Sequence, residues 1–426
     1  MPALSFLRLK NSEKKNKIGS KGANLSQTNN SSTSNTTRLP TELLMQIISY
    51  IQDIGDIRRL SLASRTLRAI VEPQLYHTLF IRTKRDLSKQ INAIQLSFAT
   101  PHIRVQITEI RIAFGEIAGR DSYLSTPDSQ KREWEADLGD AIASLPNLQI
   151  LWFNCASRHS FGGLKHAWLA KLQTKQLRQL DITCAGRWDD ADFEFLYAPC
   201  TSKLRALNMN GIEPRNPASM ALQWQLVKAP SQTIDRLAYD GSFTPAWLVE
   251  NRAIKNIVCL VDECTLTLGT SDLTASLTRN NKSRLDLLYA MDIQTWLPGQ
   301  VSSPYINLTS LGSVTIDDVA PTDLIAQMKP LSFLKRLKLV EFSFSYLAVL
   351  QSSWVEHLVV LGALESQHPL LSRVYSVVRF RGNEGKAFMH EKINGVWSQR
   401  PVRYLSYWQI ANGESYDQDD PKWRSW

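Results

Sequence analysis

The sequence predicts an α/β chain in which a small helical module precedes a curved solenoid of strand–helix repeats. Residues 38–82 contain three short helix patterns, each with its apolar residues on one face. Ten short apolar strings then recur between residues 107 and 360, on average about 28 residues apart. Helical faces lie between several of these strings. A single strand–helix unit cannot form a core alone, so we expect the units to stack and share one.

The first helix of the module is predicted to begin at Pro40, because proline lacks the N–H that the first helical turn leaves unpaired. Its apolar residues recur at steps of three and four, which places them on one broad face. They are Leu43, Leu44, Ile47, Ile48 and Ile51.

Two further short helices are expected in the same module. Gly55 should end the first run, and Asp56 should cap a second helix. Ser64 should cap the third helix, which Pro73 should end or redirect. The apolar residues of these two helices are Ile57, Leu60 and Leu62, and then Leu67, Ile70 and Val71.

These residues, in this order and spacing, resemble an F-box, and more closely the F-box of ascomycete fungal proteins. Two positions depart from that family, because Leu67 and Tyr76 stand where many members carry tryptophan. The resemblance covers about a tenth of the chain. The matching residues are Leu39-Pro40, Glu42-Leu43, Ile47-Ile48, Asp56-Ile57, Leu60-Ser61-Leu62, Ser64-Arg65, Leu67-Arg68 and Leu75-Tyr76.

The resemblance implies the substrate-recognition subunit of a Skp–cullin–F-box ubiquitin ligase, in which the F-box binds a Skp-type adaptor and, through it, a cullin. The remaining chain would bind an unknown substrate protein. One alternative is that the apolar residues are simply the core of a helical domain. Another is a repeat scaffold that never binds a Skp adaptor. The residues expected to form or support the adaptor surface are Leu39, Pro40, Leu43, Leu44, Ile47, Ile57, Leu60 and Leu67.

The recurring strings resemble the degenerate leucine-rich repeats that follow many F-boxes, whose units span about 20–29 residues. Each string is expected to be a short strand with alternating inward side chains. Steps between strings vary from 20 to 41 residues, so an α/β domain with an open sheet stays an alternative. The strings begin at Ile107, Leu148, Leu177, Leu204, Ile234, Ile254, Leu285, Leu311, Leu334 and Val355.

Four regions follow from these patterns. Residues 1–37 are expected to be a disordered tail rich in Lys, Ser, Asn and Thr. Residues 38–82 are expected to be the F-box that the resemblance implies, and residues 83–365 the leucine-rich-repeat-like solenoid. Residues 366–426 are expected to cap the solenoid, although the Arg and aromatic residues interleaved at 374–410 are also typical of single-stranded nucleic-acid binding.

The net charge of +9 is unevenly distributed. Residues 1–38 hold seven basic residues and one acidic residue, so the other 388 residues share an excess of only three positive charges. This distribution makes nucleic acid an unexpected partner. The basic tail is compatible with nuclear import, with contact to an anionic surface, or with a plain flexible leader.

No catalytic motif is present, so we expect a non-enzymatic protein without cofactors. Five cysteines lack metal-ligand spacing. Cys155, His159 and His166 lie close in sequence, but a tetrahedral zinc site needs a fourth ligand and none is evident. Buried free thiols are therefore expected instead of a zinc site. No run approaches the length of a membrane span. These features favour a cytoplasmic or nuclear protein.

Overall fold

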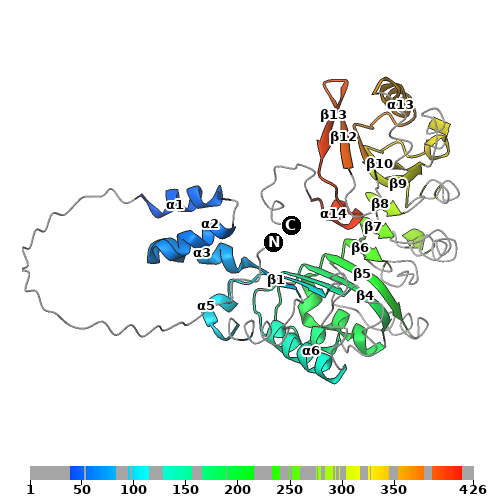
Figure 1. Cartoon of the computed structure of the whole chain (residues 1–426). Coiled ribbons are helices and arrows are strands. Elements are labelled where there is room, and N and C mark those ends of the chain that lie inside the picture. The colour runs from blue at the N-terminus through cyan, green and yellow to red at the C-terminus, as the bar shows by residue number, and fades with distance from the viewer. Residues whose placement is uncertain are drawn as a thin grey trace, which may run out of the picture. The chain divides into compact units, whose positions relative to one another are not determined.

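The computed structural model divides the chain into two compact units, Met1–His77 and Thr78–Trp426 (Figure 1). It describes residues 39–51, 54–82, 95, 98–114, 128–155, 166–188, 190–214, 233–239, 249, 252–259, 275, 277–279, 284–290, 293, 297, 304–316, 325–326, 328–344, 354–378 and 386–414. The expected tail at 1–37 lies outside these residues.

The first unit contains three described helices, α1 (Thr41–Ser49), α2 (Ile54–Ala63) and α3 (Arg65–His77). Pro40 occupies the N-cap of α1, and its carbonyl oxygen accepts a hydrogen bond of 3.1 Å from Leu44 N–H. Ser64 caps α3 as predicted, because its Oγ accepts from Leu67 N–H at 3.1 Å. Three buried side chains, Ile48, Ile57 and Val71, form the centre of this unit.

Three predictions about helix ends are wrong. Gly55 lies inside α2, and Asp56 belongs to its first turn, where it pairs with Arg59 at 2.5 Å instead of capping the helix. Pro73 lies inside α3, which continues to His77. Proline removes one backbone N–H donor from the helix. Leu75, two residues further on, packs against the core, and this contact stabilises the continued helix.

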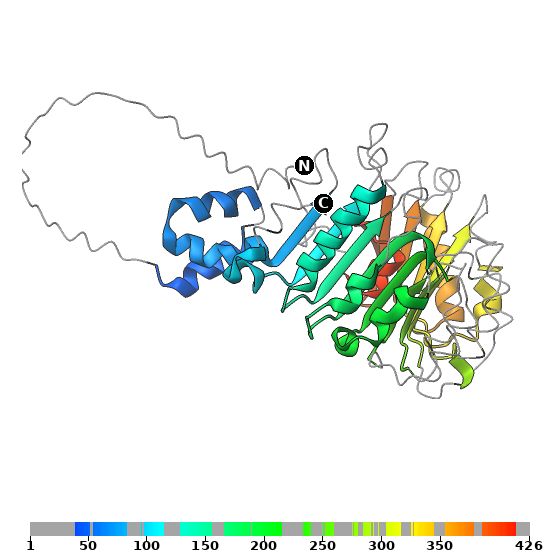
Figure 2. The ribbon, with the colours of Figure 1, turned by 90° about the horizontal axis from the view of Figure 1, so that it is seen from below.

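The described strands of the second unit form one sheet whose order follows the sequence (Figures 1 and 2). Neighbours from β1 to β11 are parallel, and β12 and β13 add antiparallel strands at the end. The strands are β1 (Thr78–Arg82), β2 (Glu109–Phe114), β3 (Ile150–Cys155), β4 (Gln179–Trp188), β5 (Ala206–Pro214), β6 (Arg236–Tyr239), β7 (Asn256–Cys259), β8 (Leu287–Ala290), β9 (Ser310–Ile316), β10 (Leu339–Phe344), β11 (Arg373–Val378), β12 (Lys386–Ile393) and β13 (Val396–Val402).

Short helices connect some of these strands, and one follows β13. They are α5 (Pro101–Arg104), α6 (Asp128–Ala143), η2 (His166–Lys171), η3 (Asp190–Tyr197), η4 (Pro199–Lys203), η6 (Lys329–Leu331), α13 (Trp354–Gln367) and α14 (Tyr407–Ala411). The chain is thus α/β with a long sheet, as the sequence predicts. Residues 78–82, which the sequence assigns to the helical module, form β1 and pair with β2.

Aliphatic side chains at one strand position align across the sheet and form its core. Leu180 lies between Leu151 and Leu207, and Leu237 lies between Leu207 and Ile257. All five are fully buried. Stacking repeats bury a continuous apolar column that no single repeat could bury alone.

A second regularity fixes the register where each strand begins. Thr108 O accepts hydrogen bonds from Gln149 N–H at 2.7 Å and Ile150 N–H at 3.0 Å. The same paired acceptance recurs from strand to strand, so every repeat starts in the same register. The accepting carbonyls belong to Thr108, Gln149, Arg178, Arg205, Asp235, Lys255, Asp286, Thr309 and Lys338.

The predicted strings match the strands from β2 to β8, but the last three do not. In β9, Leu311 pairs with Leu288, so Leu308 leads this string. In β10 the core-facing residues are Val340 and Phe342, because Leu339 belongs to the opposite face. Residues 355–360 lie in α13. A short run rich in Leu and Val can form either a buried helix or a buried strand, and its composition alone does not distinguish the two.

Two helical glycines provide a matched test of this packing. A Cβ added at buried Gly139 in α6 would lie 2.5 Å from Trp168 Cγ, whereas a Cβ at Gly362 in α13 meets nothing within 4 Å. We predict that Gly139→Ala lowers the free energy of unfolding by about 1–3 kcal/mol through overpacking. Gly362→Ala should raise it by up to about 1 kcal/mol, because alanine favours the helix. Urea denaturation of both variants checks this, and equal stability of the two variants would contradict the packing of α6 on η2.

Candidate functional site

The helical unit exposes large apolar side chains along α1 and just before it. Leu39 is 52% exposed, Leu43 45% and Ile47 51%. Leu43 and Ile47 are four residues apart and therefore share one face of the helix. Pro40 is exposed beside them, and Leu44 is half-buried. A folded unit this small rarely leaves so many large apolar side chains exposed unless they bind a partner.

The other predicted adaptor residues have a different position. Ile57 is buried in the centre of the unit, and Leu60 and Leu67 pack partly buried against it. These three side chains hold α1, α2 and α3 together. They support the exposed face of α1 instead of forming it.

Sequence reasoning missed three further exposed apolar residues. Met45 lies outside the apolar stripe of α1, whereas Tyr50 is the residue after the helix, three positions beyond Ile47, and both are exposed. Leu62 was predicted to share the apolar side of α2, but its side chain is 79% exposed. Leu62 is two residues from Leu60, about half a helical turn around the axis, so helical periodicity could have revealed its position. We call Leu39, Leu43, Met45, Ile47, Tyr50 and Leu62 the apolar surface of the helical unit.

Charged pairs contribute little to this unit. Arg59 Nη1 lies 2.5 Å from Asp56 Oδ1, and Arg68 Nε lies 3.1 Å from Glu72 Oε1. Both arginine side chains are well exposed, and exposed pairs of this kind are worth at most about 1 kcal/mol. The energetics of the unit, and of any complex it forms, therefore depend on its apolar side chains.

The second unit has a distinct feature on the sheet face opposite its main core. Residues from β5 to β13 there pack against the C-terminal segment that contains α14. Trp408, Ile410 and Ala411 of this segment are buried. The buried sheet residues in this cluster are Ala206, Ala238, Val258, Leu287, Tyr289, Leu339, Tyr375, Val377, Ala387, Met389 and Val402.

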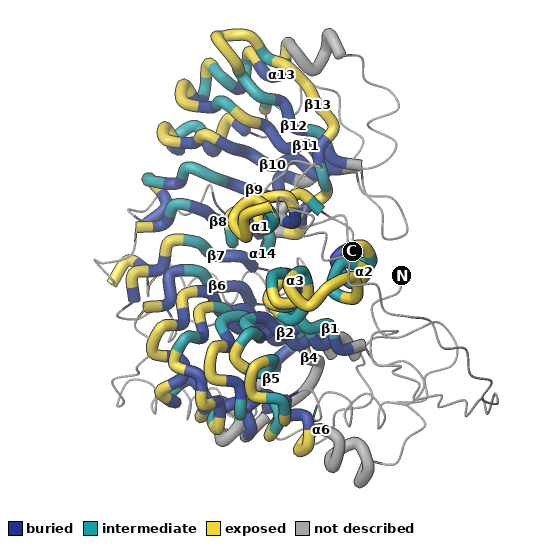
Figure 3. Tube along the Cα trace, turned by 90° about the vertical axis from the view of Figure 1, so that its left-hand side faces the viewer, coloured by how far each residue is buried: buried dark blue, intermediate teal, exposed yellow. Residues whose placement is uncertain are grey.

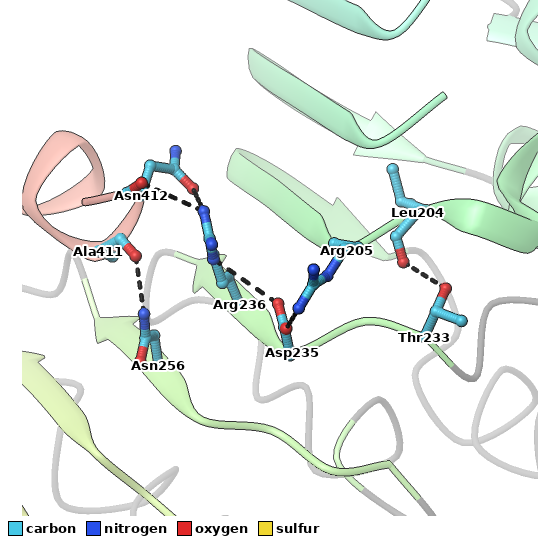
Figure 4. A network of polar contacts seen from close by, with 8 residues as sticks. All are labelled: Leu204, Arg205, Thr233, Asp235, Arg236, Asn256, Ala411 and Asn412. Atoms are coloured by element: carbon cyan, nitrogen blue, oxygen red, sulfur yellow. Dashed lines mark hydrogen bonds and ion pairs between the residues drawn. The ribbon is translucent and has the colours of Figure 1, made fainter. Parts of the chain in front are cut away.

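Polar contacts fix the end of α14 on the sheet (Figure 4). Asn256 Nδ2 donates to Ala411 O at 2.7 Å, and Arg236 Nη1 donates to Asn412 O at 3.2 Å. Both donors face carbonyl oxygens that the helix end leaves unpaired. At the other end, Ser406 and Gln409 form a capping box.

An acidic side chain is buried on this same face. Asp181 of β4 is 2% exposed, and its Oδ1 accepts a hydrogen bond of 2.6 Å from Asn208 Nδ2 of β5. Burial raises the pKa of Asp181 to about 7. The Asn208 amide and then the Trp408 indole act against this rise.

Other chemistry is limited in the described residues. No group of three or more His, Cys, Asp or Glu side chains there could hold a metal ion. The set Cys155, His159 and His166 lies partly outside these residues. Burial raises the pKa of Cys200 to about 11 and that of Cys259 to about 12, so both thiols stay protonated at neutral pH. In the same part of the chain, no helix combines the length and apolar character of a membrane span.

Comparison with known proteins identifies the helical unit. A family model described as F-box-like matches residues 36–82, which include all three helices and the apolar surface. Residues 36–82 are therefore an F-box-like domain, a class of module that mediates protein interaction and generally binds Skp-type adaptors. No curated protein matches the chain.

The buried carboxyl group generates a pH prediction. Asp181 has an ordinary pKa of 3.8 and a pKa of about 7 in the folded chain. Between these pH values the folded state holds a proton that the unfolded state has released, so stability falls as the pH rises through this range. We predict that Asp181→Asn, which cannot ionise, raises the free energy of unfolding by a few kcal/mol above pH 7. The gain should vanish near pH 4.

Urea denaturation at pH 4.5, 6 and 8 measures this difference. Asp140→Asn, at an exposed position on α6, controls for the loss of one negative charge. A gain that is equal at all three pH values would mean that Asp181 does not titrate as described.

Proposed function

We propose that this chain is the substrate-recognition subunit of a Skp–cullin–F-box ubiquitin ligase. One observation carries the proposal: the F-box-like match falls on the unit that exposes Leu39, Leu43 and Ile47. A match to the family and an uncovered apolar surface are independent observations. Together they favour a module that is completed by an adaptor protein.

The physical driving force would be the removal of apolar area from water. Each large aliphatic side chain gains about 1.5–3 kcal/mol on complete burial. The costs of association consume part of this gain, so several such side chains are needed for a stable complex. The apolar surface of the helical unit offers four of them, Leu39, Leu43, Ile47 and Leu62, together with Met45 and Tyr50.

The second unit would hold the target protein. Its sheet of successive parallel strands and its aligned aliphatic column resemble an irregular leucine-rich-repeat solenoid. The strands β12 and β13 would then act as the terminal cap that solenoids require. In this proposal residues 78–82 belong to the repeat unit, since they pair with β2.

The chain would contribute proximity and no chemistry of its own. A ligase complex brings the target close to an enzyme that transfers ubiquitin, and this approach converts a bimolecular step into an effectively unimolecular one. The cullin would be reached only through the adaptor. Such a role places the chain in the cytoplasm or the nucleus.

The apolar surface provides the test. We predict that Leu43→Asp, and likewise Leu39→Asp combined with Pro40→Ala, weakens binding of a purified Skp-type adaptor to the full chain by at least about tenfold. An aspartate in an apolar interface must be desolvated without a partner. Isothermal titration calorimetry measures the affinity.

Leu370→Asp provides the matched control, since Leu370 is 52% exposed, as Leu39 is, but lies in the second unit. The control should bind the adaptor like the unchanged chain. If the unchanged chain does not bind the adaptor at all, the chain is better described as a repeat scaffold for protein interaction.

A further inference from the structure

A groove of about 940 Å³ lies in the second unit where β3 to β7 begin. It follows the row of paired backbone hydrogen bonds that fixes the strand register. We call it the strand-start groove. Its lining residues are Gln149, Ile150, Arg178, Gln179, Lys203, Arg205, Ala206, Thr233, Ile234, Asp235, Arg236, Ala253 and Lys255.

The groove is strongly basic. Five of its lining residues are Lys or Arg, and one is acidic. This excess of four positive charges exceeds the excess of three that all residues after position 38 carry together. The other residues after position 38 therefore carry a net charge of only −1, so the net positive excess of this part of the chain lies at one edge of the sheet.

The single acidic residue organises the groove more than it neutralises it. Asp235 is buried, and it forms ion pairs with Arg205 and, at 3.6 Å, with Arg236 Nε. Arg205 itself is 57% exposed, so its guanidinium is held in place and still faces solvent. An arginine held in this way loses less conformational entropy when it binds an anion.

Two further basic side chains of the groove, those of Arg178 and Lys255, are exposed. Arg178 and Lys255 form no ion pair within the described part of the chain. Both occupy the position just before a strand, as Arg205 does, and such turns remain exposed while the strands are buried (Figure 3). Neighbouring strands are about 4.8 Å apart, so these charges form a row across the repeats.

The lining chemistry indicates what kind of anion fits. None of the lining residues is aromatic, whereas grooves for single-stranded nucleic acid use aromatic side chains to stack bases. The amides of Gln149 and Gln179 and the hydroxyl of Thr233 instead offer hydrogen bonds to a peptide backbone. Thr233 already donates to Leu204 O at 2.7 Å, and its oxygen can still accept.

We propose that the strand-start groove binds an acidic, extended segment of the target protein. The inference rests on the proposed function, because it takes the bound partner to be the ligase target. Carboxylates or phosphate groups of that segment would pair with Arg178, Arg205 and Lys255. Bidentate pairing with arginine suits both groups.

Fluorescence anisotropy of the full chain with labelled peptides tests the proposal. The probes are a twelve-residue peptide rich in Glu, its Gln counterpart, and a version with phosphoserine in place of some Glu residues. We expect the Glu and phosphoserine peptides to bind and the Gln peptide not to bind. The stronger of the two anionic peptides identifies the source of the negative charge. Equal binding of all three peptides would overturn the proposal.

Charge reversal locates the binding site. Arg178→Glu combined with Lys255→Glu should weaken the Glu peptide at least tenfold, and Arg178→Gln combined with Lys255→Gln should weaken it less. Arg65→Glu combined with Arg400→Glu makes the same change of net charge at exposed positions outside the groove, and it should have little effect. Equal losses in the groove and control variants would contradict the assignment.

Two further measurements separate the possible failures. Adaptor titration of the groove variants should match the unchanged chain, so loss of peptide binding with intact adaptor binding refutes the groove alone. Absent adaptor binding with intact peptide binding refutes the ligase role alone. A twelve-nucleotide single strand that binds more tightly than the Glu peptide, and weakens with the same charge reversal, would identify a nucleic-acid groove instead.

Discussion

The small size of the helical core constrains everything else about this chain. Within the described residues, only Ile48, Ile57 and Val71 are buried in the cluster that joins α1, α2 and α3. Three side chains cannot hide the apolar residues that these helices carry, so Leu39, Leu43 and Ile47 remain in water. Small units expose a larger share of their surface than large ones, and a partner is one physical way to cover it.

The second unit solves the same problem by repetition. Each strand places one aliphatic side chain, such as Leu180 or Leu207, into a column shared with its neighbours. Because this column fills one sheet face, the opposite face and the strand starts are left for other uses. The segment around Trp408 covers part of the opposite face. The basic side chains at the strand starts stay exposed, and this is where the structure can offer charge to a partner.

Sequence periodicity predicted a large part of this organisation. The helices of the first unit and the strands from β2 to β8 follow directly from apolar spacing. The register of β9 and β10 and the helix α13 did not follow from apolar spacing. Leu308 and Leu337 could be recognised as the first residues of their apolar strings only once the strand pairing was known. The sequence predicted only in part which apolar residues of the helical unit are buried and which are exposed. Ile57 and Leu62 were expected on the same side of α2, yet Ile57 is buried and Leu62 is exposed. The groove also has a signal in the sequence. A basic residue directly follows the first apolar residue of some strings, as in Leu177-Arg178 and Leu204-Arg205, and this pattern could have predicted a row of positive charges.

Hydrogen–deuterium exchange of the full chain, with and without a Skp-type adaptor, tests the central claim most directly. If the helical unit is completed by the adaptor, amides of Thr41–Ala63 should exchange more slowly in the complex, because the opening of a small unit is suppressed by binding. Amides of β4 to β8 should exchange at unchanged rates. Unchanged exchange in α1 and α2 at saturating adaptor, or protection confined to the sheet, would contradict the account.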